Sequence, residues 1–182
     1  DKLHPVIFYS MIIGNTVHFI HLAYPTDIVT DIRNYNHFNP KELNPILKLA
    51  ICEDNPSHYE IIHTILQKYP PGAFEITHFT SGDEFLRAAA ENGCPYSIVL
   101  TDIDLGSDAV NGISLAEKIN HISPDTQIIF ISQYLQYATA VYETEHAYFI
   151  HKQQMEKYLP LALRAACQKL QKLHTRYLYF SG

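Results

Sequence analysis

Between residues 46 and 173, short apolar runs alternate with longer segments of helical periodicity, and this alternation constrains the fold more than any other feature. Such alternation predicts βαβ units, in which successive strands run parallel because each crossover helix returns the chain to the same edge of the sheet. The run at 97–101 is almost continuously apolar, as expected of a parallel strand buried on both faces. We therefore predict an α/β domain with a five-stranded parallel sheet and helices on both faces.

Turn and capping residues place the expected elements. Asn55-Pro56 supplies a cap and a first-turn proline for the first helix, and Ser81 with Glu84 forms a capping box for the second. The expected strands are 49–52, 74–79, 97–101, 127–131 and 147–150. The expected helices are 55–68, 81–93, 112–122, 134–142 and 154–173, with Pro160 in the first turns of the last one. A closing segment, 176–180, is expected to be a strand.

Residues 1–45 are expected to be a separate N-terminal extension, because Asn39-Pro40 and Asn44-Pro45 are turn-forming pairs typical of a linker. From residue 3 to residue 26 there is no Lys, Arg, Asp or Glu, which raises the alternative of a membrane span or signal. Polar residues interrupt that run, and β-branched and aromatic residues flank Gly14-Asn15, so a β-hairpin fits better. We divide the chain into an extension at 1–45, a domain at 46–173, and the start of a truncated output domain or linker at 174–182.

Charge and cysteine content limit the partners and the compartment. A net charge of −6 argues against a nucleic-acid-binding surface spread over this chain. Cys52, Cys94 and Cys167 are odd in number and lack metal-ligand spacing, so buried, reduced thiols in a cytoplasmic protein are expected. The eleven histidines show no zinc-site spacing, and we expect scattered structural roles for them. No membrane partner is expected.

Acidic residues and a lysine directly follow three of the predicted strands. Glu53 and Asp54 follow the first strand, Asp102 the third and Lys152 the fifth. The ends of parallel strands meet at one edge of a sheet, so these side chains should share a pocket there. Carboxylates packed this closely need a cation between them, and an all-oxygen site suits Mg²⁺. The pattern indicates phosphoryl chemistry.

Four ordered segments make the resemblance to a known family specific. The segments 51–55, 100–104, 129–132 and 149–152 resemble the four motifs of a response-regulator receiver domain, in the right order and at matching separations. The resemblance covers residues 47–173 and implies the flavodoxin-like fold of CheY-like receivers. The closing segment 177–180 is similar to the opening strand of a LytTR DNA-binding domain.

The receiver resemblance implies roles for four acidic residues. Asp102 would be the phosphoacceptor, a carboxylate nucleophile that forms an aspartyl phosphate. Asp54 and Asp102 would bind Mg²⁺ directly, together with the backbone carbonyl of Asp104. Glu53 would act through the water shell of the metal, although the family more often has Asp at that position.

The resemblance also implies a phosphate contact and a switch. Lys152 would contact the phosphoryl group, the Ser132 hydroxyl would bond to a phosphoryl oxygen, and Phe149 would be the switch aromatic. The sequence departs from the receiver pattern at two places near these residues. The loop from Asp102 to Gly112 is two residues longer than usual, so 106–109 should bulge beside the site, and Gln153 replaces the usual proline after Lys152.

The leading hypothesis is a non-enzymatic switch that takes a phosphoryl group from a sensor histidine kinase and controls an output domain. DNA would be contacted only through an output domain missing from this chain, and a homodimer would form on the face made by 134–142, 147–150 and 154–173. One alternative is a haloacid-dehalogenase-like, Mg²⁺-dependent phosphatase that uses Asp102 and Asp104. In that pattern the nucleophile strand comes first among the motifs, whereas Glu53 and Asp54 precede Asp102 here. A third alternative is an interaction module in which the acids are incidental.

Overall fold

The computed structural model describes residues 9–13, 16–20, 46–106, 110–138 and 140–180, and the chain forms two compact units, residues 1–37 and 38–182. In the first unit, β1 (Tyr9–Ile13) and β2 (Thr16–Ile20) lie within the predicted hairpin and pair antiparallel. The predicted turn at residues 14–15 and the predicted linker at 39–45 lie outside the described residues. The boundary after residue 45 therefore stays a prediction. None of the helices in the described ranges has the length and apolar content needed to cross a membrane.

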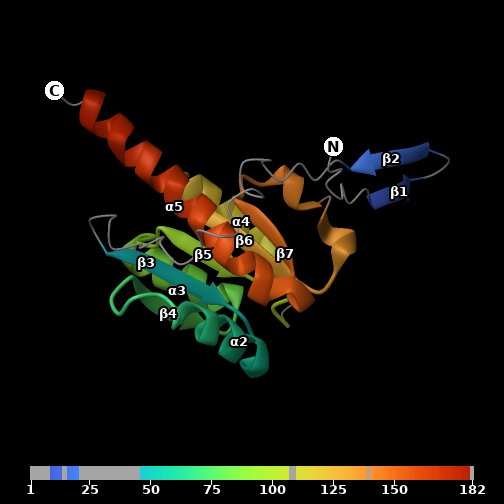
Figure 1. Ribbon diagram of the computed structural model, residues 1–182, viewed down its shortest axis with the longest axis horizontal. Helices are drawn as coiled ribbons and strands as arrows, with labels where there is room; N and C mark the ends of the chain where they lie inside the picture. The colour runs from blue at the N-terminus through green and yellow to red at the C-terminus, as the bar shows by residue number, and fades with distance from the viewer. Residues whose placement is uncertain (1–8, 14–15, 21–45, 107–109, 139, 181–182) are drawn as a thin grey trace, which may run out of the picture. The chain divides into compact units, whose positions relative to one another are not determined.

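The second unit contains the predicted five-stranded parallel sheet, with the strand order β4-β3-β5-β6-β7 (Figure 1). Its strands are β3 (Leu47–Cys52), β4 (Phe74–Phe79), β5 (Ile98–Thr101), β6 (Gln127–Ser132) and β7 (Tyr148–His151). The register aligns the carboxyl ends, since Thr101 at the end of β5 pairs with Cys52 of β3 on one side and with Phe130 of β6 on the other. Residues that follow these strands are thereby brought to one edge.

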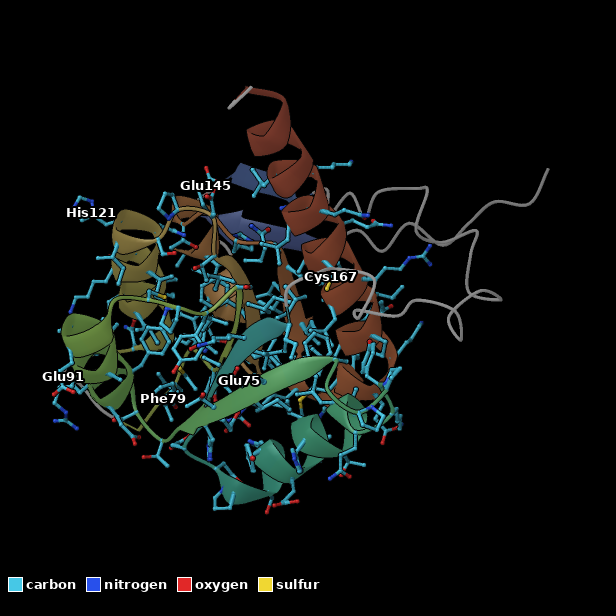
Figure 2. All side chains as sticks on the ribbon, turned by 90° about the vertical axis from the view of Figure 1, so that its left-hand side faces the viewer. Glu75, Phe79, Glu91, His121, Glu145 and Cys167 are labelled. Atoms are coloured by element: carbon cyan, nitrogen blue, oxygen red, sulfur yellow. The ribbon has the colours of Figure 1, made fainter. Side chains whose placement is uncertain are left out.

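Helices cover both faces of the sheet, as predicted (Figure 2). The helices are α2 (Pro56–Leu66), α3 (Gly82–Asn92), α4 (Gly112–Ile122) and α5 (Met155–Phe180). Successive strand side chains point to opposite faces, so Leu49 and Ile51 pack under α2 and α5, whereas Ala50 and Cys52 pack under α3 and α4. Because both of their faces are buried, the central strands β5 and β6 read as nearly continuous apolar runs.

Side-chain caps begin the helices where the sequence predicts them. The Asn55 Oδ1 atom accepts hydrogen bonds from the backbone N–H groups of Ser57 at 2.9 Å and His58 at 3.4 Å. Ser81 Oγ accepts from the backbone N–H of Glu84 at 3.2 Å, while the Glu84 carboxylate accepts from the backbone N–H of Thr80 at 2.8 Å. These bonds satisfy backbone donors that the first helical turn leaves free.

Two predicted elements are wrong. The expected α-helix at 134–142 is a pair of 3₁₀ turns, η3 (Leu135–Ala138) and η4 (Ala140–Glu143), in a segment whose aromatic and β-branched residues have weak helix propensity. The expected strand at 176–180 is the last part of α5, which runs to Phe180. Alternating aromatic residues favour a strand only when a neighbouring strand pairs with them, whereas extending an existing helix adds one backbone hydrogen bond per residue. Pro160 lies in the second turn of α5, within the predicted limit.

Candidate functional site

The backbone fixes two of the acidic residues at the carboxyl edge of the sheet. The N–H of Glu53 donates to the carbonyl of Phe79 at 3.1 Å, and the N–H of Asp102 donates to the carbonyl of Cys52 at 3.0 Å. Both bonds extend the parallel ladder one residue beyond the ends of β3 and β5. The positions of these carboxylates are therefore set by the sheet itself rather than by a mobile loop.

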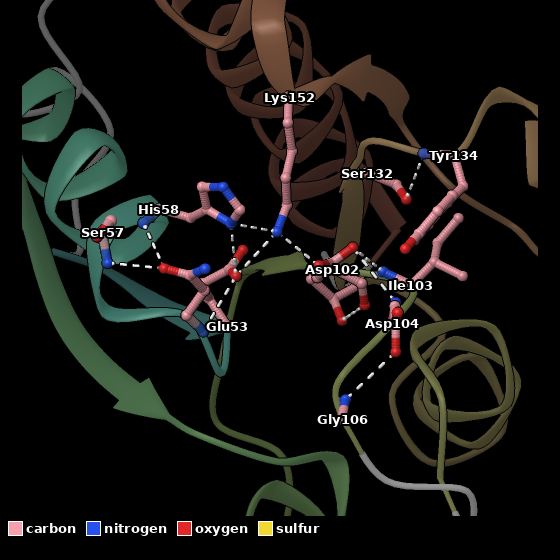
Figure 3. Close-up of polar contacts among 12 residues, drawn as sticks. Glu53, Ser57, His58, Asp102, Ile103, Asp104, Gly106, Ser132, Tyr134 and Lys152 are labelled. Carbon is pink, nitrogen blue, oxygen red and sulfur yellow. Dashed lines mark hydrogen bonds and ion pairs between the residues drawn. The ribbon is translucent and has the colours of Figure 1, made fainter.

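Asp102 lies at the centre of the site and is only 5% exposed (Figure 3). One carboxylate oxygen, Oδ1, accepts hydrogen bonds from the backbone N–H groups of Ile103 at 2.6 Å and Asp104 at 3.3 Å. The other oxygen, Oδ2, lies 2.6 Å from the Lys152 ammonium. Oδ1 is thus held by the backbone, while Oδ2 is paired with a side-chain cation.

Lys152 joins residues that are far apart in the sequence. Its Nζ atom lies 2.6 Å from Asp102 Oδ2, 2.9 Å from Glu53 Oε1 and 2.7 Å from His58 Nδ1 (Figure 3). The residue is 8% exposed, so this ammonium is largely removed from water. Charges are tolerated in such surroundings only when they are paired and hydrogen-bonded, which these three contacts provide.

Glu53 is the most deeply buried acid of the site, at 1% exposure. Its Oε1 atom accepts hydrogen bonds from Lys152 and, at 3.3 Å, from the backbone N–H of Asn55. Its Oε2 atom is buried and has no hydrogen-bond partner among the described residues. Burial raises the pKa of Glu53 above its ordinary value, while the hydrogen bond and the charge of Lys152 act in the opposite direction.

The three acids form a set of oxygen ligands that fits a hard cation. Glu53, Asp54 and Asp102 each offer a carboxylate oxygen, and these atoms all lie within 4.8 Å of one another. The unpaired Glu53 Oε2 supplies an acceptor to such a group. Gly106, with a φ of 63°, lies against this set, since a Cβ there would be 2.8 Å from Asp54 Oδ2. The Asp104 side chain is exposed, outside this carboxylate group, and accepts from the Gly106 N–H at 3.4 Å.

The two predicted switch residues lie on neighbouring strands. Ser132 ends β6 and is fully buried, and its Oγ atom accepts a hydrogen bond from the backbone N–H of Tyr134 at 3.2 Å. Phe149 lies in β7, pairs in register with Phe130 of β6, and packs half-buried against the hydrophobic cluster under α3 and α4. Their roles in switching stay predictions.

Sequence reasoning missed His58, which lies in the first turn of α2. Its Nδ1 atom is 2.7 Å from Lys152 Nζ and 3.2 Å from Glu53 Oε1. A usable signal was its position: a helix that begins at the carboxyl edge of the sheet, directly after Glu53 and Asp54, holds its first-turn side chains near that edge. His58 thus lies in the candidate site, and the scattered structural roles expected of the histidines stay a prediction.

The long loop after Asp102 returns to the site at Gly112. The N–H of Gly112 donates to the carbonyl of Ile103 at 2.9 Å, and a Cβ on Gly112 would overlap the Asp102 carbonyl oxygen. Only glycine fits such a close approach. Of the bulge predicted at 106–109, residues 107–109 lie outside the described part of the chain. After Lys152, Gln153 is exposed within the short 3₁₀ turn η5 (Lys152–Gln154).

Comparison with known proteins supports one family. The model of the response regulator receiver domain matches residues 49–164. Accessory gene regulator protein A of Staphylococcus aureus is 32% identical over 111 residues, which are 58% of this chain and 46% of that protein. The response regulator receiver protein CpdR of Brucella abortus is 29% identical over 85 residues, which are 47% of this chain and 65% of that protein. The chain thus spans about half the length of the first of these relatives.

Solved structures agree on the fold. The N-terminal domain of a response regulator/sensory box/GGDEF protein from Carboxydothermus hydrogenoformans superposes with a TM-score of 0.59 at 21% identity, covering 70% of this chain and 98% of that one. A receiver domain protein from Clostridium thermocellum gives a TM-score of 0.58 at 20% identity, over 70% and 98% of the two chains. These similarities show the CheY-like fold.

The motif order, the fold and the family match agree with one another, and none of them supports the phosphatase alternative. Glu53 and Asp54 follow β3, which is next to β5, the strand before Asp102. Lys152, which contacts the Glu53 and Asp102 carboxylates, follows β7. The chain therefore belongs to the response regulator receiver domain family and contains the receiver domain of a two-component response regulator.

Proposed function

We propose that Asp102 is the phosphoacceptor of this receiver and takes its phosphoryl group from a sensor histidine kinase. One observation carries the proposal: the buried Asp102 carboxylate has one oxygen held by two backbone N–H groups and the other 2.6 Å from the Lys152 ammonium. The ordered, desolvated carboxylate is a nucleophile, and the adjacent cation can offset the charge of an incoming phosphoryl group.

The transfer balances without further reagents. A carboxylate oxygen of Asp102 attacks phosphorus, an O–P bond forms, and the N–P bond of the kinase phosphohistidine breaks, with its electron pair leaving on the imidazole. The phosphohistidine ring carries a proton on its other nitrogen, so it leaves as neutral imidazole. The positive charge of that ring cancels the charge lost from the carboxylate, and the phosphoryl oxygens keep the negative charge they already carried. Lys152 donates to one of those oxygens as a compact point charge.

The carboxylates around Asp102 suit a Mg²⁺ cofactor. Asp54, Asp102 and the backbone carbonyl of Asp104 would hold the ion directly, and Glu53 would act through its water shell. The support is the close group formed by Glu53, Asp54 and Asp102 and the unpaired oxygen of Glu53. When bound, Mg²⁺ supplies positive charge that offsets the charge on the phosphoryl oxygens.

Phosphorylation would switch the face made by η3, η4, β7 and α5. The new phosphoryl group carries about −1.5 to −2 charge and draws the Ser132 hydroxyl toward it, which moves the loop after β6. Space left by Ser132 admits the Phe149 ring, and the face changes between two packings. We propose that a homodimer forms on this face.

The output of the whole protein is DNA binding through a LytTR-type domain outside this chain. Its support is the similarity to accessory gene regulator protein A, of which this chain matches only 46%, so that relative has room for a further domain. The solved RcsB–DNA complex, which superposes with a TM-score of 0.57 at 19% identity, shows a response regulator on DNA. Residues 176–180 are helical, so their similarity to the opening strand of a LytTR domain no longer supports this output.

A cytoplasmic location is supported by the free thiols of Cys52, Cys94 and Cys167.

The test is the intact mass of the purified chain after incubation with acetyl phosphate and Mg²⁺. We expect one added phosphoryl group on the parent chain and none on Asp102→Asn. Asp125→Asn is the matched control, because Asp125 is exposed and lies just before β6, at the amino edge of the sheet opposite the predicted site residues, and should behave as the parent. Phosphorylation of Asp102→Asn at the parent rate would refute the assignment.

A further inference from the structure

His58 completes the surroundings of the Lys152 ammonium. A lysine ammonium has three N–H donors, and three acceptors lie around this one: Asp102 Oδ2 at 2.6 Å, Glu53 Oε1 at 2.9 Å and His58 Nδ1 at 2.7 Å. Two of these are carboxylate oxygens, and the third is an imidazole nitrogen. Because every donor has an acceptor, the buried ammonium is held in one place.

The contact also determines the tautomer of His58. An ammonium can only donate, so a Nδ1 atom 2.7 Å from it must present a lone pair, and the ring proton must then be on Nε2. In the other tautomer the Nδ1–H would point at the ammonium hydrogens and could donate only to Glu53 Oε1, which is farther away at 3.2 Å. The shorter contact assigns the Nε2–H tautomer.

His58 belongs to a rigid element. It is the third residue of α2, and its backbone N–H donates to the capping Asn55 side chain. Its side chain is 28% exposed and, with Lys152 and Tyr134, borders a cavity of about 400 Å³. The imidazole therefore offers Lys152 an acceptor whose place is fixed by the start of a helix rather than by a loop.

We propose that His58 is a positioning residue that holds Lys152 through phosphoryl transfer, an inference that rests on the proposed role of Asp102. During transfer, negative charge leaves the Asp102 carboxylate, and Lys152 must turn one donor to a phosphoryl oxygen. A cation bound at the site would also interact with the Glu53 and Asp102 carboxylates and so weaken their pairing with Lys152. The neutral imidazole takes part in neither change, so its hydrogen bond to Lys152 persists while the other two exchange partners.

Three variants separate the hydrogen bond from the histidine ring. His58→Leu keeps similar bulk but removes the acceptor, whereas the Oδ1 atom of His58→Asn can occupy the place of Nδ1. His63→Leu is the control, since His63 lies one turn later on α2 and contacts Tyr59 and Gln67 instead of the site. Phosphorylation by acetyl phosphate with Mg²⁺ should be about tenfold slower in His58→Leu, because one donor of a buried ammonium is left unsatisfied. His58→Asn should be several-fold faster than His58→Leu, and His63→Leu should match the parent.

A spectroscopic measurement on the metal-free chain does not depend on phosphorylation. Nitrogen-15 NMR of the parent should show His58 with an unprotonated Nδ1 and should show a slowly exchanging Lys152 ammonium. The ammonium signal should be lost in His58→Leu and retained in His58→Asn. An Nδ1–H tautomer in the parent, or an ammonium signal unchanged in His58→Leu, would overturn the inference.

The kinetic outcomes distinguish this inference from the proposed function. If the parent is phosphorylated and His58→Leu reacts as fast, or if both His58 variants are slowed equally, His58 does not position Lys152 through its acceptor atom. If the parent itself takes no phosphoryl group, the proposed function fails, and the positioning role in transfer fails with it.

Discussion

Lys152 decides the charge balance of the site, because it is the cation that both Glu53 and Asp102 contact. Burying two carboxylates side by side is unfavourable, and the ammonium compensates for much of that cost. In the proposed function, a phosphoryl group or a cation would take over part of this pairing. A single lysine thus compensates two buried carboxylates in the resting domain.

Replacing Lys152 by Met should show how much the ammonium contributes to the stability of the domain. In the presence of a chelator, Lys152→Met should lower the free energy of unfolding by about 3–5 kcal/mol, because two buried carboxylates lose their shared partner. The pKa of Glu53 in the folded state then rises further above its unfolded value, because the lowering effect of Lys152 is lost, so the folded state binds protons more tightly and the deficit should shrink as the pH is lowered from about 8 to about 5. Burial already raises the pKa of Glu53 in the parent chain, in the same direction.

Urea unfolding at several pH values measures this deficit. Lys118→Met, at an exposed position on α4, is the control and should change stability by less than about 0.5 kcal/mol. A deficit that stays constant or grows on acidification would contradict the charge-balance explanation.

The cysteines give a second prediction at the scale of single residues. Burial raises the pKa of the Cys167 thiol to about 12 and that of the Cys52 thiol well above its usual range, so neither forms a thiolate at neutral pH. Cys94 is half-buried. In the folded protein a thiol reagent should therefore modify one cysteine, and Cys94→Ser should abolish the reaction. Fast modification of two or more thiols before unfolding would show that the core packing is looser than described.

At the scale of elements, the start of α2 links folding to the site. Asn55 caps the helix and fixes the backbone of His58, so its side chain acts on stability and on the site together. Asn111 caps α4 through the N–H of Ser114 at 2.9 Å, on the other face of the sheet. The two caps form a matched pair.

Asn55→Ala and Asn111→Ala should each lower the free energy of unfolding by about 1 kcal/mol, the usual cost of losing a cap. Only Asn55→Ala should also slow phosphorylation, because it loosens the turn that carries His58. Thermal unfolding and the acetyl phosphate reaction measure the two effects. Equal slowing in both variants would mean that the loss follows general stability rather than the geometry of α2.

The elements also show what the sequence could and could not predict. Glu53, Asp102 and Lys152 were placed correctly at one edge because each directly follows an apolar strand, and parallel strands end together. His58 was missed because its partner Lys152 is 94 residues away in the chain, and their contact depends on the angle of α2 against the sheet. At 134–142 and 176–180 local propensity was weak, and tertiary packing or continuation of a helix decided the structure.

For the whole molecule, the predicted consequence of phosphorylation is a change in association. Ser132 Oγ accepts from the Tyr134 N–H in the present structure, so the hydroxyl is tied to the loop that leads into η3. The Ser132→Ala chain should still be phosphorylated. Phosphorylation should change the face of η3, η4, β7 and α5 less in this variant, because a modification shifts the equilibrium between two packings only by its different contacts with each of them.

Sedimentation of phosphorylated and unphosphorylated chains measures this coupling. We expect the parent to shift toward a dimer on phosphorylation and Ser132→Ala to shift less. Ser57→Ala, exposed in the first turn of α2, serves as the control and should shift as the parent does. An identical shift in Ser132→Ala, or none in the parent, would remove Ser132 from the switch.

The strand order described above makes the site a late product of folding. Neighbouring strands of the sheet are all parallel, so no two of them can join through a tight hairpin, and the Glu53–Lys152 contact closes a separation of 99 residues. On the ribosome, the acids at the ends of β3 and β5 emerge long before the lysine that follows β7. In the proposed function, a nascent or half-folded chain therefore has no complete acceptor site. Pulse phosphorylation during refolding should accordingly label only chains in which β7 has already docked.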